Sequence, residues 1–245
     1  MNEKITFGLH LLYKTFIMQT RIDDNNITLL NKYLDSLMVS KERKSFAHML
    51  VGQIRQQKKS QQLLMDHNHP DCKIFTNLCL ISALEYMKKF YEIQSTDLDI
   101  ENQQERIPQI NNMWSVHSFE GDYNTIHTHG CKTVMGISIV AWTKVPKQIR
   151  DLPEMGSLKN ASGSKDGFLE FVVGDNDVRD GEQLKFSGYT SVKPEVGVMY
   201  IFPSWVQHLV WPFFGEGERR SISANVNMFP LSQLSPKAQE RYKKG

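Results

Sequence analysis

Two histidines one residue apart could together hold a metal ion. His127 and His129 lie in the stretch Gly121–Gly130, which reads GDYNTIHTHG. On a strand, side chains at positions i and i+2 project to the same face, so both imidazoles can converge on one ion. Imidazole is largely neutral at cellular pH and is therefore available as a ligand. The pair alone is an incomplete site, and its alternative reading is two side chains at an exposed strand end.

A third ligand must come from elsewhere, and His208 is the best candidate. It lies in FPSWVQHLV, after the apolar run EVGVMYIF and a turn marked by a proline. Such a position can aim a side chain back into a cleft. An early pair of histidines, an intervening β-rich region and a late histidine predict a facial set of three ligands. That arrangement leaves positions on the metal open for exogenous ligands.

Other histidines are weaker candidates. The string DHNHPDC, Asp66–Cys72, also contains two histidines one residue apart. Its proline and polar neighbours predict a loop between helices, and no second ligand cluster follows at the spacing of a zinc finger. We therefore expect surface histidines there. His117, in MWSVHSF, is expected to be a core or surface residue and not a ligand.

A carboxylate-binding pair follows the third histidine. In GERRSISANVN, alternate residues separate by type: Arg219 and Ser221 begin a polar set, and Arg220 begins a set that continues with apolar residues. A guanidinium with a hydroxyl on the same face suits a carboxylate, through charge-assisted hydrogen bonds. We prefer Arg219 over Arg220 for this role because it shares its face with Ser221. The polar face either meets water or lines a pocket inside a barrel, and the alternation leaves both open.

The elements that would position these residues change near the middle of the chain. Residues 26–93 favour helices, with apolar residues at helical spacing after DDNN and again in IFTNLCLISALEYMKKFYEI. From Trp114 onward, short β-rich runs follow: TVMGISIVAW, FLEFVV, EVGVMYIFP and RSISANVNMF. We expect one α+β domain over residues 1–245, mainly β. Its parts are a mostly helical support in 1–112, a β core in 113–229 and a tail in 230–245.

Composition excludes several classes of protein. A content of 40% hydrophobic and 23% charged residues is ordinary for a globular domain, and a net charge of +2 gives no strong pull toward nucleic acid. No apolar run has transmembrane length, and charged residues interrupt the N-terminal apolar residues, unlike a signal peptide. Three cysteines without CxxC spacing suit a reducing compartment. We expect a cytoplasmic protein that uses no membrane.

The segments GDYNTIHTHG, PEVGVMYIFPSWVQHLVWP and GERRSISANVN resemble the Fe(II)- and 2-oxoglutarate-dependent oxygenase superfamily. More narrowly, they are similar to the 2-oxoglutarate (2OG)–Fe(II) oxygenases of marine phages and bacteria. The resemblance implies a double-stranded β-helix (a jelly-roll, cupin-like fold) with the N-terminal helices packed on one sheet. It implies Fe(II) as cofactor, 2OG and dioxygen as cosubstrates, and hydroxylation of a substrate with release of succinate.

The resemblance also implies roles for residues. His127 and His208 would be iron ligands, Arg219 with Ser221 would bind the far carboxylate of 2OG, and Tyr123 would hydrogen-bond the same cosubstrate. Most members have HxD or HxE, whereas this chain has His129 where the carboxylate belongs. His129 is expected to be a direct ligand. The alternative is that Asp122 or water completes the coordination.

Three functions remain open. The first is an oxygenase acting on a peptidyl residue, a nucleic acid or a small molecule. The second is a non-catalytic, cupin-like metal-binding or structural phage protein. The third is an enzyme resembling cysteine dioxygenase, which uses three histidines without 2OG; the Arg-x-Ser sequence favours 2OG over this option. The sequence identifies neither the substrate nor the oligomeric state.

Overall fold

The computed structural model describes residues 8–12, 15–52, 62–94, 106–133, 135–152, 165–172, 189–237 and 239–240. Most of the regular structure there is antiparallel β-sheet. The strands are β1 (Gly8–Leu12), β2 (Thr15–Arg21), β3 (Gln62–Leu64), β4 (Arg106–Ser118), β5 (Asn124–His127), β6 (Gly136–Lys144), β7 (Leu169–Val172), β8 (Tyr189–Val192), β9 (Val198–Pro203), β10 (Gln207–Val210) and β11 (Arg219–Pro230). The helices are α1 (Asp24–Val39), α2 (Lys73–Gln94) and the single turn α3 (Lys147–Arg150), with short 3-10 turns at Ala47–Met49, Pro70–Cys72 and Leu231–Gln233.

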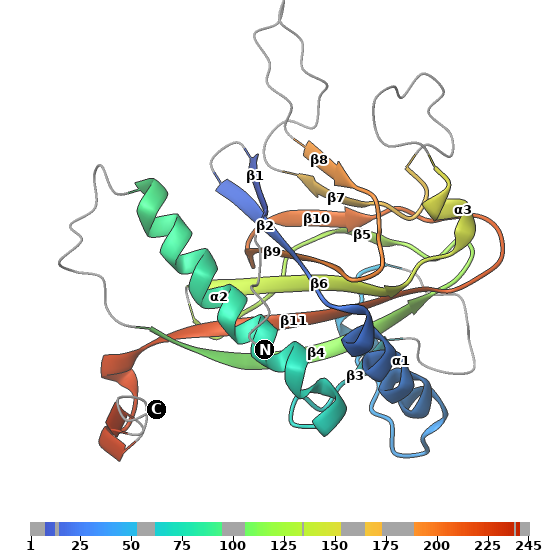
Figure 1. Ribbon diagram of the computed structural model, residues 1–245. Helices are drawn as coiled ribbons and strands as arrows, with labels where there is room; N and C mark the ends of the chain where they lie inside the picture. Colours follow the sequence, from blue (N-terminus) through green and yellow to red (C-terminus); the bar gives the residue numbers. More distant parts are fainter. Residues whose placement is uncertain are drawn as a thin grey trace, which may run out of the picture.

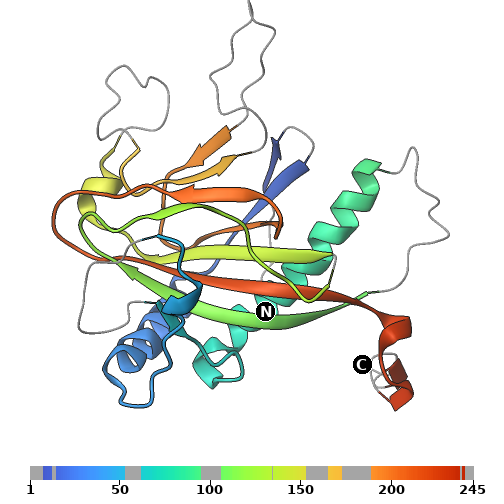
Figure 2. The ribbon, with the colours of Figure 1, turned by 180° about the vertical axis from the view of Figure 1, so that it is seen from behind.

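The strands form two sheets. The large sheet has the order β1-β2-β9-β6-β11-β4-β3, and the small sheet has the order β5-β10-β7-β8. Figures 1 and 2 show the small sheet lying over one face of the large one, with α1 and α2 on the opposite side. In the described part of the chain, no helix is both long and apolar enough to cross a membrane.

The two long helices cover the outer face of the large sheet. Helix α1 begins after Asp23, whose carboxylate accepts the backbone N–H of Asn26 at 2.9 Å, as an N-cap residue does. Its apolar stripe and that of α2 share one core cluster with the large sheet. That cluster contains Leu30 and Leu34 of α1, Phe75 of α2, and Ile222 of β11. Both helices expected from the periodicity are confirmed, and the helical layer packs on one sheet.

A second apolar cluster fills part of the space between the sheets. Trp142 of β6, Tyr200 and Phe202 of β9, and Phe171 of β7 belong to it. The rings of Phe171 and Phe202 meet edge to face with centroids 4.9 Å apart. Since these two residues come from different sheets, the contact ties the small sheet to the large one.

Strand β11 lies between β6 and β4 near the centre of the large sheet, and its two faces differ as the sequence indicates. Ile222, Ala224 and Val226 pack into the core under the helices. Ser221 and Asn225, on the opposite face, line a pocket between the sheets. The polar face therefore encloses a cavity, which decides between the two alternatives that the alternation left open.

Residues 1–112 contain strands beside the helices expected there. Strands β1, β2, β3 and the first half of β4 lie there, and β2 pairs with β9 in the large sheet. Strand β2 is buried on both faces: Phe16 and Met18 belong to the cluster under the helices, and Ile17 belongs to the cluster between the sheets. A strand that is covered on both faces has no polar-apolar alternation to reveal it.

Candidate metal and carboxylate site

A pocket lies between the two sheets and is lined by residues from both. Its volume is about 110 Å³. One water molecule needs roughly 10–15 Å³ of such volume, counted as the space that the centre of a water molecule can occupy. The pocket therefore has room for a small organic acid or several water molecules. His127, His129, His208 and Arg219 all line it.

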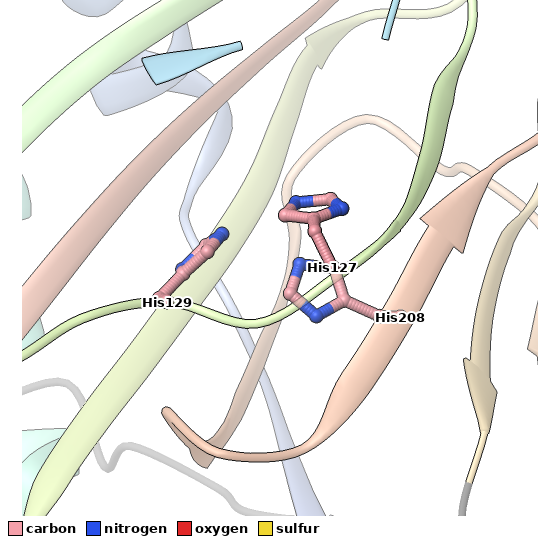
Figure 3. A group of neighbouring side chains, drawn as sticks. All are labelled: His127, His129 and His208. Carbon is pink, nitrogen blue, oxygen red and sulfur yellow. The ribbon is translucent and has the colours of Figure 1, made fainter. Parts of the chain in front are cut away.

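The three predicted histidines meet in this pocket. His127 ends β5, His208 lies on β10, and the two residues are direct partners in the antiparallel register. Their ring centroids lie 4.2 Å apart, and the ring of His129 lies 4.7 Å from that of His208 and 5.4 Å from that of His127. One ligand atom from each of the three lies within 4.8 Å of the others, and no further titratable residue among those described joins the group. Figure 3 shows the three rings facing a common space.

The position of His129 differs from the expectation in one respect. Strand β5 ends at His127, so His129 lies beyond the strand, and the alternation of strand side chains does not orient it. Its backbone N–H instead donates to the carbonyl of Ser204 at 2.9 Å. This bond joins the segment after β5 to the turn before β10, which brings His129 toward His208. The convergence predicted from strand geometry is therefore reached by a different route.

The rings of His127 and His208 are oriented by the same kind of hydrogen bond, from Nδ1 to the backbone carbonyl two residues earlier. The Nδ1 atom of His127 lies 2.6 Å from the carbonyl oxygen of Thr125, and that of His208 lies 3.0 Å from the carbonyl oxygen of Val206. A carbonyl oxygen only accepts, so each Nδ1 donates and each Nε2 keeps its lone pair. The Nδ2 amide of Asn124 lies 3.2 Å from Nε2 of His127, which agrees with an accepting Nε2.

The ring of His129 is oriented by side chains of the large sheet. Its Nδ1 lies 3.0 Å from the carboxamide oxygen of Asn225 and 3.0 Å from Oγ of Ser138. The Ser138 hydroxyl itself donates to the same Asn225 oxygen at 2.9 Å. Nδ1 of His129 therefore donates, and its Nε2 is left with a lone pair. Metal-ligating histidines commonly donate their second ring N–H to an oxygen in this way.

Burial keeps the three imidazoles neutral. Desolvation lowers the pKa of His127 and, together with the neighbouring His127, lowers the pKa of His129 to about 4. Desolvation and then the two neighbouring histidines lower the pKa of His208 well below its usual value. All three rings are thus unprotonated near neutral pH, the state in which imidazole binds metals.

Arg219 lies in the same pocket and has unused hydrogen-bonding capacity. It is 4% exposed, its Nη1 donates to the carbonyl of Gly167 at 2.9 Å, and its buried Nε has no partner. Burial lowers the pKa of Arg219 to about 10, although nearby Asp122 opposes the shift, so the guanidinium is charged at neutral pH. A buried, charged guanidinium with one N–H that lacks an acceptor is suited to an anionic ligand.

Arg220, the competing arginine, lies on the other face of β11 and is not in the pocket. Its guanidinium donates to Glu218 and to Asp35, with closest distances of 2.7 Å to each. His117 is fully buried, as a core residue, and its Nδ1 lies 2.6 Å from Glu218. These residues tie β4 and β11 to helix α1, and their charges are already paired.

Of the remaining candidate residues, some line the pocket and others do not. Ser221 and Tyr123 line the pocket, although Tyr123 is 37% exposed at its edge. Asp122 is buried and accepts the backbone N–H of Phe119 at 2.8 Å. It does not belong to the histidine group, which removes it as the alternative third ligand. The histidines of DHNHPDC likewise form no metal-binding group in the portion that the structure describes.

Sequence reasoning did not assign Asn225 or Ser138 a role in the site. Asn225 was visible as a polar residue on the face of Arg219, but its contact with His129 joins positions 96 residues apart. The ring of Trp114 stands edge-on to His129 at 5.3 Å and lies 5.3 Å from Phe46, which continues the pocket wall outward. These contacts depend on the packing of the sheets, and no local pattern encodes them.

The residues present suit an Fe(II) ion and a dicarboxylate. Three unprotonated imidazole nitrogens are ligands that Fe(II) accepts, and a facial set of three leaves open positions for a chelating cosubstrate. Arg219 supplies the unpaired cationic donor that a distant carboxylate needs. The histidines come from the small-sheet side of the pocket and Arg219 from the large sheet, so a ligand can extend from one to the other.

Known proteins agree with this interpretation. The model of a family described as "Putative 2OG-Fe(II) oxygenase" matches residues 112–225. This segment contains His127, His129, His208 and Arg219. A search of curated proteins finds no match.

Solved structures are similar to this chain at low identity, and AviO1 among them exceeds a TM-score of 0.5. AviO1 from Streptomyces viridochromogenes Tue57 is 9% identical, with a TM-score of 0.52 over 86% of this chain and 89% of that one. A prolyl-4-hydroxylase of Pseudomonas putida is 13% identical, with a TM-score of 0.48 over 86% and 91% of the two chains. HygX from Streptomyces hygroscopicus, solved with nickel and 2-oxoglutarate, is 9% identical, with a TM-score of 0.46 over 86% and 82%.

The structural likenesses concern the fold, and the family match concerns the segment that carries the site. By that match the segment 112–225 is similar to 2OG-Fe(II) oxygenases, enzymes whose cofactor is Fe(II) and whose cosubstrates are 2-oxoglutarate and dioxygen.

Proposed function

We propose that the protein is a hydroxylase that couples oxidative decarboxylation of 2OG to succinate with hydroxylation of a second substrate. The observation that carries this proposal is the pairing, in one pocket, of three converging histidines with a buried arginine whose Nε lacks an acceptor. We further propose that the two facing sheets form a double-stranded β-helix in a single domain. The reversal between β9 and β10 then delivers His208 opposite His127.

His127, His129 and His208 would hold Fe(II) through their Nε2 atoms. Each Nδ1 is engaged with an oxygen, from Thr125, Asn225 and Val206 respectively, so each ring offers its other nitrogen to the pocket. Bound there, Fe(II) would supply the activation of dioxygen that releases carbon dioxide from 2OG and introduces oxygen at a C–H bond. The protein contributes fixed ring orientations, which limit the reorganisation needed to load the metal.

Arg219 would bind the far carboxylate of 2OG with its free guanidinium N–H, helped by the hydroxyl of Ser221 on the same face. The site is largely closed to water at this end, since Arg219 is 4% and Ser221 6% exposed. A charge-assisted hydrogen bond in such surroundings contributes roughly 1.5–3 kcal/mol. Tyr123, at the wetter edge of the pocket, would donate a further hydrogen bond to 2OG.

Replacing the usual carboxylate ligand by His129 changes the charge of the site. Two histidines and a carboxylate reduce the net charge around Fe(II) to +1, whereas three neutral histidines leave +2. The site should therefore bind anionic 2OG more strongly than a carboxylate-containing site with the same contacts. Asn225 suits a histidine at this position because its oxygen accepts a hydrogen bond from the Nδ1–H group.

A purely structural, cupin-like role is not favoured by the buried arginine. Leaving Arg219 Nε unpaired costs stability, and a scaffold protein gains nothing from that cost. An enzyme resembling cysteine dioxygenase would share the histidines and require no 2OG. We take the 2OG oxygenase as the function.

The test is anaerobic addition of Fe(II) and then 2OG, observing the weak visible charge-transfer absorption of a chelated 2-oxo acid. The native protein should develop this band, and admission of air should bleach it with formation of succinate. The variant His208→Ala should bind neither metal nor 2OG, whereas the matched variant His67→Ala, altered in the DHNHPDC loop, should behave as the native protein. No band together with no succinate would exclude the proposed activity.

A further inference from the structure

The mouth of the pocket is formed by the segment Phe46–Gly52, hereafter the mouth segment. It is fixed to the edge of the large sheet, where the backbone N–H of Phe46 donates to the carbonyl of Gln62 at 2.8 Å. At its other end, Gly52 lies against β5 so closely that a Cβ atom there would be 2.1 Å from the carbonyl oxygen of Tyr123. The mouth segment thus connects the edge strand β3 of one sheet with the start of the edge strand β5 of the other.

Apolar side chains of the mouth segment line the pocket entrance and remain in contact with water. Phe46, Met49 and Leu50 all line the pocket, and Met49 is 55% exposed. From this entrance inward, Phe46 packs on Trp114, and Trp114 packs on His129, with both pairs of ring centroids 5.3 Å apart. Exposed apolar groups that lead inward along aromatic rings to a reactive centre indicate a surface made for an apolar ligand.

The pocket has little means of binding charge beyond Arg219. Among the described residues that line it, no aspartate, glutamate or lysine occurs, and Arg219 is the one permanently charged side chain. In the proposed function, Arg219 binds the far carboxylate of 2OG and is therefore not available to a second anion. A second charged group would then be buried without a partner, at a cost of several kcal/mol.

Two carboxamide oxygens in the pocket wall have no hydrogen-bond donor. Oδ1 of Asn112, on β4, and Oδ1 of Asn124, on β5, are both buried and both unpartnered, and both residues line the pocket. Asn112 is the register partner of Asn225, next to the histidines, while Asn124 contacts His127 through its Nδ2. Oxygens of this kind require an N–H or O–H group from a ligand.

We propose that the second substrate presents an uncharged, apolar group carrying an N–H or O–H donor, which enters past the mouth segment, packs on Trp114 and donates to Asn112 or Asn124. This inference rests on the proposed function, because it takes Arg219 to be used by 2OG. The preferred ligand is a neutral amide with an aliphatic side chain, either free or as a residue of a peptide.

The experiment measures binding of three blocked amino acids, the N-acetyl amides of leucine, lysine and glutamate, which share their amide donors and differ in side-chain charge. Saturation-transfer NMR is recorded on Zn(II)-loaded protein with 2OG, so that no turnover occurs. The leucine amide should give at least fivefold stronger saturation than the lysine and glutamate amides. Equal or stronger saturation of either charged amide, or no saturation of the leucine amide, would overturn the inference.

Two variants localise the binding. Asn112→Leu removes an unpartnered carboxamide oxygen, so its unfolding temperature should be unchanged or higher, while saturation of the leucine amide should fall at least fivefold. Met49→Lys should weaken binding of the leucine amide similarly, whereas Val39→Lys, at an exposed apolar position of α1 that does not line the pocket, should not. Full binding by Asn112→Leu and Met49→Lys would place the ligand elsewhere and reject the proposed subsite.

A further arm separates the free amide from a peptide residue. The same leucine, placed inside a blocked neutral pentapeptide, should bind more tightly if peptides are the source of the ligand, and equally or more weakly if free amides are. Failure of the inference is distinct from failure of the proposed function. In the first case the anaerobic Fe(II)–2OG absorption band still forms while the neutral amide is not preferred, and in the second the band itself is absent.

Discussion

The carboxamide oxygen of Asn225 lies 3.0 Å from Nδ1 of His129 and accepts a hydrogen bond from it. The two residues are far apart in sequence, and their contact fixes both the tautomer and the direction of a ring that no strand holds. In the proposed metal site, it lets His129 present its Nε2 to the pocket. The neighbouring strand supplies an acceptor for its second nitrogen.

Replacing Asn225 by alanine should therefore leave the ring of His129 less firmly oriented, while the three proposed metal ligands remain. Loss of such an outer hydrogen bond typically reduces metal affinity about 10–100-fold. Competition with a chromophoric chelator for Zn(II) measures this effect. Asn225→Asp keeps an acceptor for Nδ1 and should recover most of the affinity.

The matched control is Asn227→Ala, two residues further along the same face of β11. Asn227 accepts the backbone N–H of Lys132 at 2.8 Å and does not line the pocket. This variant should lose about 1 kcal/mol of unfolding free energy and keep its Zn(II) affinity. Equal Zn(II) affinities for the Asn225 and Asn227 variants would show that Asn225 does not position His129.

The neighbouring arginines should separate cosubstrate binding from stability. Arg219→Gln removes the unpaired cationic donor, and affinity for 2OG should fall about 10–150-fold, equivalent to one charge-assisted hydrogen bond. Isothermal titration of 2OG into Zn(II)-loaded protein measures the loss.

Arg220→Gln provides the contrast. It removes a partner of the half-buried Glu218 and should destabilise the fold by about 1–3 kcal/mol, while the folded variant keeps its 2OG affinity within twofold. If Arg220→Gln weakens 2OG binding and Arg219→Gln does not, the cosubstrate lies on the other face of β11.

Glu218 should make the fold sensitive to acid. Burial by itself would raise the pKa of Glu218, but hydrogen bonds from His117 and Arg220 outweigh that effect and hold it at about 2. Since this is below the unfolded value of 4.5, the unfolded chain binds more protons between these pH values. The stabilisation is full above about pH 4.5 and is lost as pH falls toward 2, by up to about 3 kcal/mol.

Urea unfolding at a series of pH values between 2 and 7 tests this dependence. Glu218→Gln should be less stable at pH 7 and should lose less stability on acidification, because its side chain does not titrate. A variant whose pH profile runs parallel to that of the native protein would show that other carboxylates cause the acid sensitivity.

Gly52 should tolerate no side chain. A Cβ atom there would lie 2.1 Å from the carbonyl oxygen of Tyr123 and 2.4 Å from Cα of Asn124, and backbone atoms cannot yield as a flexible side chain can. Gly52→Ala should destabilise the fold by about 1–3 kcal/mol and should displace β5, lowering metal affinity at His127. Thermal unfolding and Zn(II) competition report the two effects.

Gly8→Ala is the reference, since its Cβ would meet its nearest neighbour at an ordinary 3.7 Å. Its unfolding temperature and Zn(II) affinity should match those of the native protein. If Gly52→Ala behaves in the same way, the mouth segment does not press on β5.

The helices and strands that could be predicted from the sequence are those with one apolar, buried face and one polar face. Helices α1 and α2 bury one stripe, and β11 separates a face under the helices from a face in the pocket, so their periodicities are visible. Strand β2 was missed because it is buried on both faces. Strand β10 was missed because its four residues are too few for a pattern, although His208 was placed correctly after the turn.

In the candidate site, too, some residues could be predicted from the sequence and others could not. His127, His208 and Arg219 could be found from residue type, order and resemblance, and the structure brings them into one pocket. The roles inferred for Asn225 and the mouth segment depend on contacts between segments 16 or more residues apart, such as Phe46 with Gln62. Such contacts follow from the register and packing of the sheets, which local sequence does not specify.

Turnover of 2OG under isotopically labelled dioxygen tests the central claim most directly. The Fe(II)-loaded protein, incubated with 2OG under ¹⁸O₂, should form succinate that contains one ¹⁸O atom, in an amount equal to the carbon dioxide released. His208→Ala should form none. Absence of succinate from native protein that binds Fe(II) and 2OG, or succinate without the label, would contradict the assignment as a 2OG-dependent oxygenase.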